Sequence, residues 1–476
     1  MDTNHTRTPM DRDDIVLLEE PELSKPTCRK LLQFFQRFHQ GNLVFFLTVR
    51  ENWLRGNPDR TFPGLCANLS PITGEWRPDS EQRLWGWGDG RALGTWSSFL
   101  SNDRVPDHEV SLVLSDGHRM PANLKTALRA YVDLIHDGLM ERLRLNDNRV
   151  PFAAFLETNL SDKDPRFAYW DRGEIDFCSI FASNGFIQYG LLVGKRTSFD
   201  LGVTMLEDQV RKITAADAGS GVQTHGPRMI VLGAIGEVLK TMQTQPLDCA
   251  FDPETLKEKL IRMALPFIDH ILENHTREEP PGFWEHSDAE GNPVPDRNGH
   301  ILVDPGHATE CAGFLAELVP FLPDRWEDSG WNRGRVLQAA LDIHLFADRI
   351  GFTDAGVMTK FADLSSGEVL PDIQAVPDGS TPTAPWFSVR EHSASALRLY
   401  TLTGDKRLLR SYQRAQNASY LHYPNKRIGG QMVQTLHPHT LEVLDIAPAT
   451  GNLDPMHDGR SRVREMENLE LLLEDD

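Results

Sequence analysis

Apolar side chains recur along much of the chain at the three- and four-residue spacing of a helix that buries one face. The pattern is clearest over residues 124–135, 314–322 and 463–473, where the apolar positions share one face of a helix. Loops rich in glycine, proline, aspartate and asparagine separate such segments. The chain is therefore expected to be mainly helical.

Strand signals are fewer and short. They predict one strand near residue 45 (NLVFFLTV) and another near residue 115 (SLVLSDG). A β-hairpin is expected around residues 429–443, where glycines flank GGQMVQTLHPHTLEV. These strands would lie in the loops of a helical protein.

Two segments, 186–210 and 396–420, share a helix, a glycine-containing turn with Lys-Arg, and a second helix. Repeated hairpins of this kind bury their apolar faces only against neighbouring hairpins. No break in composition divides the chain, so residues 26–476 are expected to form a single domain behind a polar arm, residues 1–25. A closed ring of roughly twelve helices would use up this length. An open solenoid and an irregular helical protein are the alternatives.

Composition and charge narrow the range of partners. The chain is 40% hydrophobic, 25% charged and carries a formal net charge of −20, which disfavours binding to nucleic acid or to an anionic membrane. The N-terminus lacks the apolar core of a signal peptide, and no window holds eighteen apolar residues. A soluble, cytoplasmic protein is expected, with its five widely spaced cysteines as free thiols: Cys28, Cys66, Cys178, Cys249 and Cys311.

The segment DPGHATE, residues 304–310, begins an apolar helix. Asp304 is a favoured N-cap and Pro305 suits the first helical position, which places His307 in the first turn and Glu310 one turn later on the same face. The helix N-terminus lowers the pKa of His307 and Glu310 raises it, so the imidazole stays in the range where it exchanges protons near neutral pH. The alternative is a capping motif whose histidine only covers the surface.

DPGHATECAGFLAEL resembles the N-P-G-H-x-x-E-A-G-W-F-L segment of the N-acylglucosamine 2-epimerase family, whose relatives include mannose isomerases and cellobiose 2-epimerases. Three further segments resemble family segments in the same order. WGDGRALGTWSSF (87–99) carries Arg91, PWFSVREHSASALRLYTLTGDKRLL (385–409) carries Trp386 and Glu391, and MHDGRSRVREMENLELL (456–472) carries His457 and Arg460.

The resemblance implies an all-α (α/α)6 barrel of helical hairpins with short β-hairpins in the loops. It also implies an isomerase that acts on the open-chain form of free reducing sugars, with no cofactor and no metal. His307 and His457 would be the proton-transfer pair, and Arg91 would stabilise the enolate oxygen. Glu310 could orient His307 or bind a sugar hydroxyl. The implied substrate-binding residues are Arg91, Glu310, Trp386, Glu391 and Arg460.

This chain departs from the family pattern at several positions. Asp304 replaces an asparagine or histidine, Asp89 replaces a glutamine, and Ile230 stands where isomerases and cellobiose 2-epimerases carry a third histidine. His225, five residues earlier, is not expected to be equivalent. The sugar and the choice between 2-epimerase and aldose–ketose isomerase therefore stay open, as does a homodimer. A metal enzyme, a glycoside hydrolase and a sugar- or partner-binding protein are the competing hypotheses.

Overall fold

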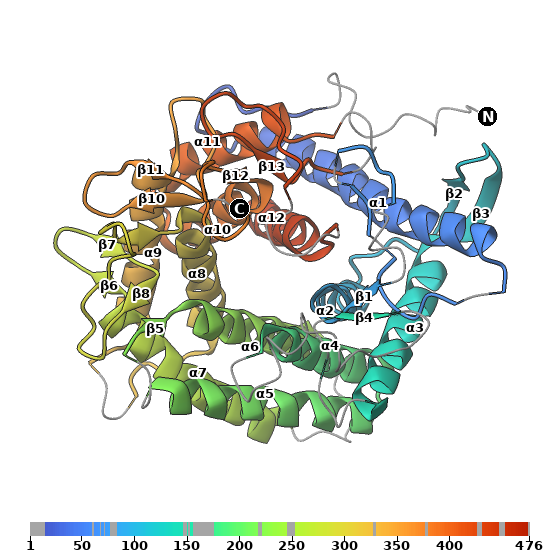
Figure 1. Ribbon diagram of the computed structural model, residues 1–476, viewed down its shortest axis with the longest axis horizontal. Coiled ribbons are helices and arrows are strands. Elements are labelled where there is room, and N and C mark those ends of the chain that lie inside the picture. Colours follow the sequence, from blue (N-terminus) through green and yellow to red (C-terminus); the bar gives the residue numbers. More distant parts are fainter. Residues whose placement is uncertain are drawn as a thin grey trace.

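Two concentric rings of helices form most of the protein, as the computed structural model shows (Figure 1). The structure describes residues 15–474 except 60, 67, 71, 77–82, 146–149, 151–152, 156–175, 218–220, 245–252, 327–329, 377–378, 426–430 and 447–452. The α-helices of this part of the chain are α1 (Lys25–Gly56), α2 (Gly86–Ser101), α3 (Leu124–Leu145), α4 (Phe177–Val193), α5 (Arg196–Asp217), α6 (Gly226–Thr244), α7 (Pro253–Asn274), α8 (Pro305–Leu318), α9 (Arg333–Gly351), α10 (Trp386–Thr403), α11 (Arg407–His422) and α12 (Met456–Glu474).

The even-numbered helices form the inner ring and the odd-numbered helices the outer ring (Figure 1). Each inner helix packs on the next inner helix, and α12 packs back on α2 to close the ring. Helices α3, α5, α7, α9 and α11 each cover the inner helix that precedes them, and α1 covers α12. The predicted (α/α)6 barrel is confirmed, and the open solenoid and the irregular helical protein are wrong.

Left-handed glycines end the first helix of both predicted hairpins. Gly194 closes α4 with φ 67°, and Gly404 closes α10 with φ 69°. Glycine adopts this conformation without the steric cost that a Cβ atom adds, so the chain reverses at once into the outer helix. The repeated helix–turn–helix pattern is thus confirmed at both places.

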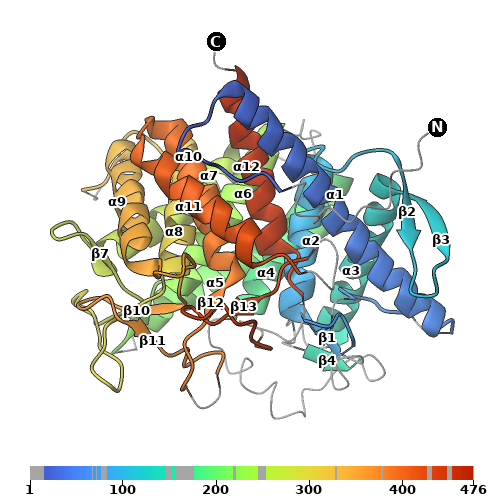
Figure 2. The ribbon, with the colours of Figure 1, turned by 90° about the horizontal axis from the view of Figure 1, so that it is seen from above.

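Short antiparallel strands connect the helices, and most of them gather at one end of the barrel (Figure 2). The pairs are β1 (Arg83–Trp85) with β4 (Ala153–Phe155), β2 (Glu109–Val113) with β3 (Arg119–Asn123), β5 (Gln223–Thr224) with β8 (His286–Ser287), β6 (Thr276–Arg277) with β7 (Gly282–Phe283), and β12 (Ala384–Pro385) with β13 (Thr435–Leu436). A three-stranded sheet has the order β11 (Val369–Leu370), β10 (Phe361–Asp363), β9 (Leu302–Val303).

The structure corrects one of the three strand predictions, confirms the second and confirms the third in a shorter form. The strand near residue 115 is confirmed as β2 of a hairpin, but the segment near residue 45 lies inside α1. There Leu43, Phe46 and Leu47 are buried at helical spacing, and a short apolar run cannot be told from a strand by periodicity alone. The predicted hairpin at 429–443, of which 429–430 lie outside the described residues, is present as a short reversal: Leu436 and Val443 form an antiparallel bridge, and backbone hydrogen bonds run from His437 to Glu442 and from Leu444 to Thr435. Strand β13 also pairs with β12.

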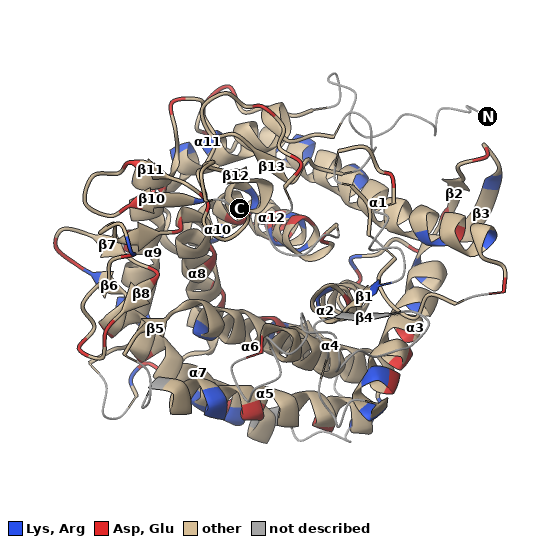
Figure 3. Ribbon diagram, viewed as in Figure 1, with Lys and Arg blue, Asp and Glu red and all other residues tan. Residues whose placement is uncertain are grey.

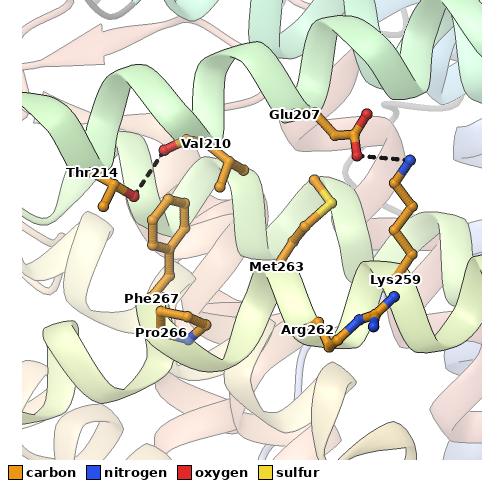
Figure 4. A pocket seen from close by; sticks show the side chains of 8 residues that line it. All are labelled: Glu207, Val210, Thr214, Lys259, Arg262, Met263, Pro266 and Phe267. Atoms are coloured by element: carbon orange, nitrogen blue, oxygen red, sulfur yellow. Dashed lines mark hydrogen bonds and ion pairs between the residues drawn. The ribbon is translucent and has the colours of Figure 1, made fainter.

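Acidic and basic residues are interspersed along the outer helices (Figure 3). A groove of about 520 Å³ runs between the outer helices α5 and α7, where Glu207 and Lys259 form a 2.7 Å ion pair beside Met263 and Phe267 (Figure 4).

The cysteines that the structure describes are free, as predicted, and buried: Cys28, Cys66, Cys178 and Cys311. Cys249 lies outside the described residues. In the described part of the chain, no helix has the length and apolar character needed to cross a membrane.

Candidate active site

The residues singled out by the sequence all lie on the first two turns of inner helices. Arg91 is on α2, His307 and Glu310 are on α8, Trp386 and Glu391 are on α10, and His457 and Arg460 are on α12. The predicted cap of α8 is present, because the Asp304 side chain accepts a 3.1 Å hydrogen bond from the backbone N–H of His307. Four inner helices thus direct their candidate residues toward one end of the barrel.

His307 is held through one ring nitrogen. Its Nδ1 lies 3.2 Å from Glu285 and 3.2 Å from Asp304, and its Nε2 has no partner among the described residues. Burial lowers the pKa of His307, but the Asp304 and Glu285 carboxylates outweigh this and raise it above its usual value, with Lys360 opposing them. A quarter of the side chain is exposed, so Nε2 is the nitrogen left for a substrate.

His457 has the same arrangement. Its Nδ1 lies 2.9 Å from Glu391, and its Nε2 lies 3.8 Å from Asp454, too far for a hydrogen bond. Burial raises the pKa of Glu391, but Arg460 and the bond to His457 lower it overall to below its usual range, so this carboxylate stays ionised. His457 is therefore also oriented through Nδ1, with Nε2 left over.

The Phe387 ring lies near both histidines, His307 and His457. Its ring centroid lies 5.0 Å from that of His457, stacked, and 6.3 Å from that of His307. The Trp386 ring meets His457 edge-on at 6.0 Å. Gly306 allows the close approach of α8 to α10, because a Cβ atom there would lie 2.4 Å from Ser388 Oγ and 3.0 Å from the Phe387 ring. The glycine of the DPGH motif is thus required by packing.

The two candidate arginines are tied to carboxylates. Arg460 donates to Glu310 at 2.6 Å and to Glu391 at 2.7 Å, and lies 3.4 Å from Glu237. Glu310 therefore bonds to Arg460, and the suggestion that it orients His307 is wrong. Arg91 donates to Asp454 at 2.5 Å, and its guanidinium lies over the rings of Trp87 and Phe181.

Removing the Arg460 charge is expected to be strongly destabilising. In Arg460→Met, the buried Glu310 and Glu391 lose their shared cation, which costs about 3–5 kcal/mol of unfolding free energy. Arg144→Met is the control, since Arg144 pairs with Glu141 on the exposed surface and its loss should change the free energy of unfolding little. Chemical denaturation of both variants measures the difference, and equal losses would contradict this role of Arg460.

Sequence reasoning missed residues that come from loops. Glu285 lies between β7 and β8, and Lys360, which pairs with Asp304, directly precedes β10. His225 was set aside, yet it directly follows β5 and lies 2.7 Å from Glu285. Two-residue strands give no periodic signal, so nothing in the pattern of the chain could have joined these positions.

Two groups of side chains are close enough to surround a metal ion. The ligand atoms of His225, Glu285 and His307 lie within 4.8 Å of one another, as do those of Glu310, Glu391 and His457. Each group already has a buried cation beside it. Lys360 pairs with Asp304 next to His307, and Arg460 bonds both glutamates of the second group. The residues therefore fit histidine–carboxylate pairs better than a metal centre.

Comparison with known proteins agrees with this architecture. The chain is similar to solved structures of cellobiose 2-epimerase from Spirochaeta thermophila DSM 6192 (15% identity, 94% of this chain, 99% of that one, TM-score 0.61) and from Bacillus thermoamylovorans B4167 (13% identity, 89% and 99%, TM-score 0.60). A D-mannose isomerase structure aligns at 13% identity over 89% and 97% of the two chains, with a TM-score of 0.59. At these identities the likeness shows the fold. No curated protein matches by sequence.

The fold is an (α/α)6 barrel, and part of the chain matches the model of one isomerase family. Residues 250–450 match the model of the N-acylglucosamine 2-epimerase family. This range contains the segments with His307 and Glu310 and with Trp386 and Glu391. The segments with Arg91 and with His457 and Arg460 lie outside it. The predicted resemblance and the predicted enzyme class are both confirmed at this level.

Proposed function

We propose that the protein is a sugar 2-epimerase or isomerase that transfers a proton at C2 of the open-chain form of a free reducing sugar. The observation that carries this proposal is the pairing of His307 and His457. Both rings lie near Phe387, both have Nδ1 beside a carboxylate, and neither Nε2 makes a hydrogen bond to the described residues. Two acid–base groups on one pocket suit proton removal and return.

The proposed reaction needs only these two groups. In an open-chain aldose, the carbonyl at C1 makes the C2 proton acidic. The Nε2 of one histidine removes that proton, and the electron pair moves to the carbonyl oxygen as an enolate. The other histidine returns a proton to the opposite face of C2, which inverts C2. Glu391 beside His457 and Glu285 beside His307 stabilise the imidazolium that forms at each step.

Arg91 is the proposed donor to the enolate oxygen. Its guanidinium stays charged and has five N–H groups, of which the ion pair with Asp454 uses only part. Glu310 and Glu391 are proposed to bind sugar hydroxyls, and the Trp386 ring to contact the sugar face. Because Arg460 bonds both glutamates, we assign it to holding them in place as well as to the pocket wall.

An aldose–ketose isomerase is the second candidate, and it uses the same pair of histidines. It differs only in that a histidine protonates C1 of the enediolate instead of C2, while the proton of the C2 hydroxyl moves to the C1 oxygen. The solved structures with this fold include both kinds of enzyme, cellobiose 2-epimerases and a D-mannose isomerase. Product identity distinguishes the two reactions.

The test is a panel of free sugars: N-acetylglucosamine, N-acetylmannosamine, glucose, mannose, fructose and cellobiose. Each is incubated with the protein, and the products are separated by chromatography. A C2 epimer supports the epimerase and a ketose supports the isomerase. Reduced sugar alcohols, which have no carbonyl, are the negative control. Cleavage of cellobiose to glucose would instead indicate a glycoside hydrolase, and binding without conversion of any sugar would indicate a binding protein.

A further inference from the structure

We propose that Glu285 and His225 are positioning residues that fix the His307 ring and determine which of its nitrogens exchanges protons. This inference rests on the proposed function for the role of His307. Neither residue lies in the four segments of the sequence that resemble the family. Both would act through His307.

Glu285 bridges the two histidines with separate oxygens. Its Oε1 lies 2.7 Å from Nε2 of His225, and its Oε2 lies 3.2 Å from Nδ1 of His307. The ring centroids of His225 and His307 are 5.9 Å apart, nearly perpendicular. His225 is fully buried, and each oxygen of Glu285 already faces a histidine nitrogen, so we assign both residues a role that acts through His307. His225, Glu285 and His307 thus form a buried chain of hydrogen bonds that ends at the candidate catalytic imidazole.

Backbone contacts of three segments hold this chain of hydrogen bonds in place. Strand β5 pairs with β8, Thr224 opposite His286, which sets His225 and Glu285 side by side at the end of that pair. The backbone N–H of Glu285 donates to the carbonyl of Leu302 in β9, which leads directly to the cap of α8. The His225 ring packs edge-on against Phe283 at 4.6 Å. The position of His307 is therefore tied to His225 through both main chain and side chains.

Hydrogen-bond chemistry sets the tautomer. Burial raises the pKa of Glu285, but His225 and His307 lower it overall to well below its usual value, so the carboxylate is ionised and only accepts. Both histidines must then donate to it, which puts the proton of neutral His307 on Nδ1 and leaves Nε2 as the exchanging nitrogen. His225 occupies the second oxygen and thereby prevents Glu285 from turning away.

Several other charged or titratable groups surround this chain of hydrogen bonds. Asp304 and Lys360, from the α8 cap and the start of β10, face His307 as an ion pair. His275 and His286 lie near His225 and Glu285, and burial lowers the pKa of both, so they stay neutral at pH 7. Arg228, on α6, and His270, on α7, also act on His275, and Asp372 acts on Lys360. Glu285 is the carboxylate that links His307 to a second histidine.

Glu285→Gln tests the proposal in the full chain, with ¹⁵N NMR of the His307 ring as the main measurement. In the wild type we expect the Nδ1–H tautomer. In Glu285→Gln we expect a mixture of tautomers, a His307 titration midpoint lower by about one pH unit, and kcat reduced at least about tenfold with little change in KM. The pH profile of kcat should shift with the ring titration. Glu285→Asp should restore part of the shift.

Asp348→Asn is the matched control, because Asp348 is a carboxylate 3.1 Å from Nε2 of His392, outside the candidate site. It should leave the His307 titration unchanged. If Glu285→Gln does not fold, His225→Gln tests the same chain of hydrogen bonds. It should shift the titration midpoint of His307 in the same direction. An unaltered tautomer and midpoint in the variant that folds would overturn the proposal. The ring measurement does not need turnover, so failure of the proposed function gives a different result: no sugar is converted, while the ring still responds to Glu285.

Discussion

His307→Asn and His457→Asn each lower kcat by about 10²–10⁴-fold on the sugar that the wild type converts. Asparagine places an amide nitrogen near the position of Nδ1, so the contact with Glu285 or Glu391 can persist. It has no counterpart of Nε2, the nitrogen proposed to carry the proton. The expected loss is therefore in the chemical step, and KM should change little. Steady-state kinetics on purified variants measures it.

The control is His392→Asn, a buried histidine that bonds Asp348 and Ser411 away from the candidate site. It should lose stability but retain most of kcat once folded. Thermal unfolding of all three variants separates the two effects. If either site variant keeps wild-type kcat while folded, that histidine is not part of the proton-transfer pair.

Lowering the pH from 7 to 5 reduces the free energy of unfolding by about 2 kcal/mol for each of three buried histidines. Burial lowers the pKa of His39 to about 3 and of His275 to about 2, and places that of His344 well below its usual value. In the folded state they stay neutral at pH 5. In the unfolded state they bind protons below about pH 6.5, so acid favours unfolding.

Other titratable groups offset this loss of unfolding free energy only in part. His307, whose pKa is raised, works in the opposite direction and offsets part of it. Glu285 and Glu391 have lowered pKa values, so their stabilising effect is lost only below about pH 4.5.

Urea denaturation at pH 7, 6 and 5 measures the slope of stability with pH. His39→Phe should reduce this slope by about one third, whatever its effect on stability at pH 7. A stability that does not change between pH 7 and 5 would show that these histidines titrate normally in the folded state.

Local signals in the sequence predicted the helical part of the fold well. The Asp304 cap, the Gly194 and Gly404 turns and the terminal helix all follow from residue chemistry that acts over a few positions. The segment near residue 45 was mispredicted because its short apolar run fits a strand as well as a buried helix, and burial against the barrel decided between them.

The candidate site was predicted where its residues lie on helices with recognisable segments. Those residues are found together, although their roles stay predictions. Their partners were not predicted, because Glu285 and Lys360 enter from loops whose positions depend on two-residue strands. For the same reason the sequence offers His307, a neighbour on the same helix, as one of two possible partners of Glu310, whereas the structure bonds Glu310 to Arg460 on α12. Contacts between distant segments are set by the closed ring and leave no mark in local sequence.

The most direct test of the central claim is proton NMR in D2O with the sugar panel and the wild-type protein beside His307→Asn and His457→Asn. Proton transfer at C2 predicts deuterium at C2 together with a new C2 epimer, or a deuterated ketose, and loss of both in the two variants. If wild-type protein converts a sugar without taking up deuterium at C1 or C2, or exchanges nothing on any sugar, the account of a two-histidine isomerase is contradicted.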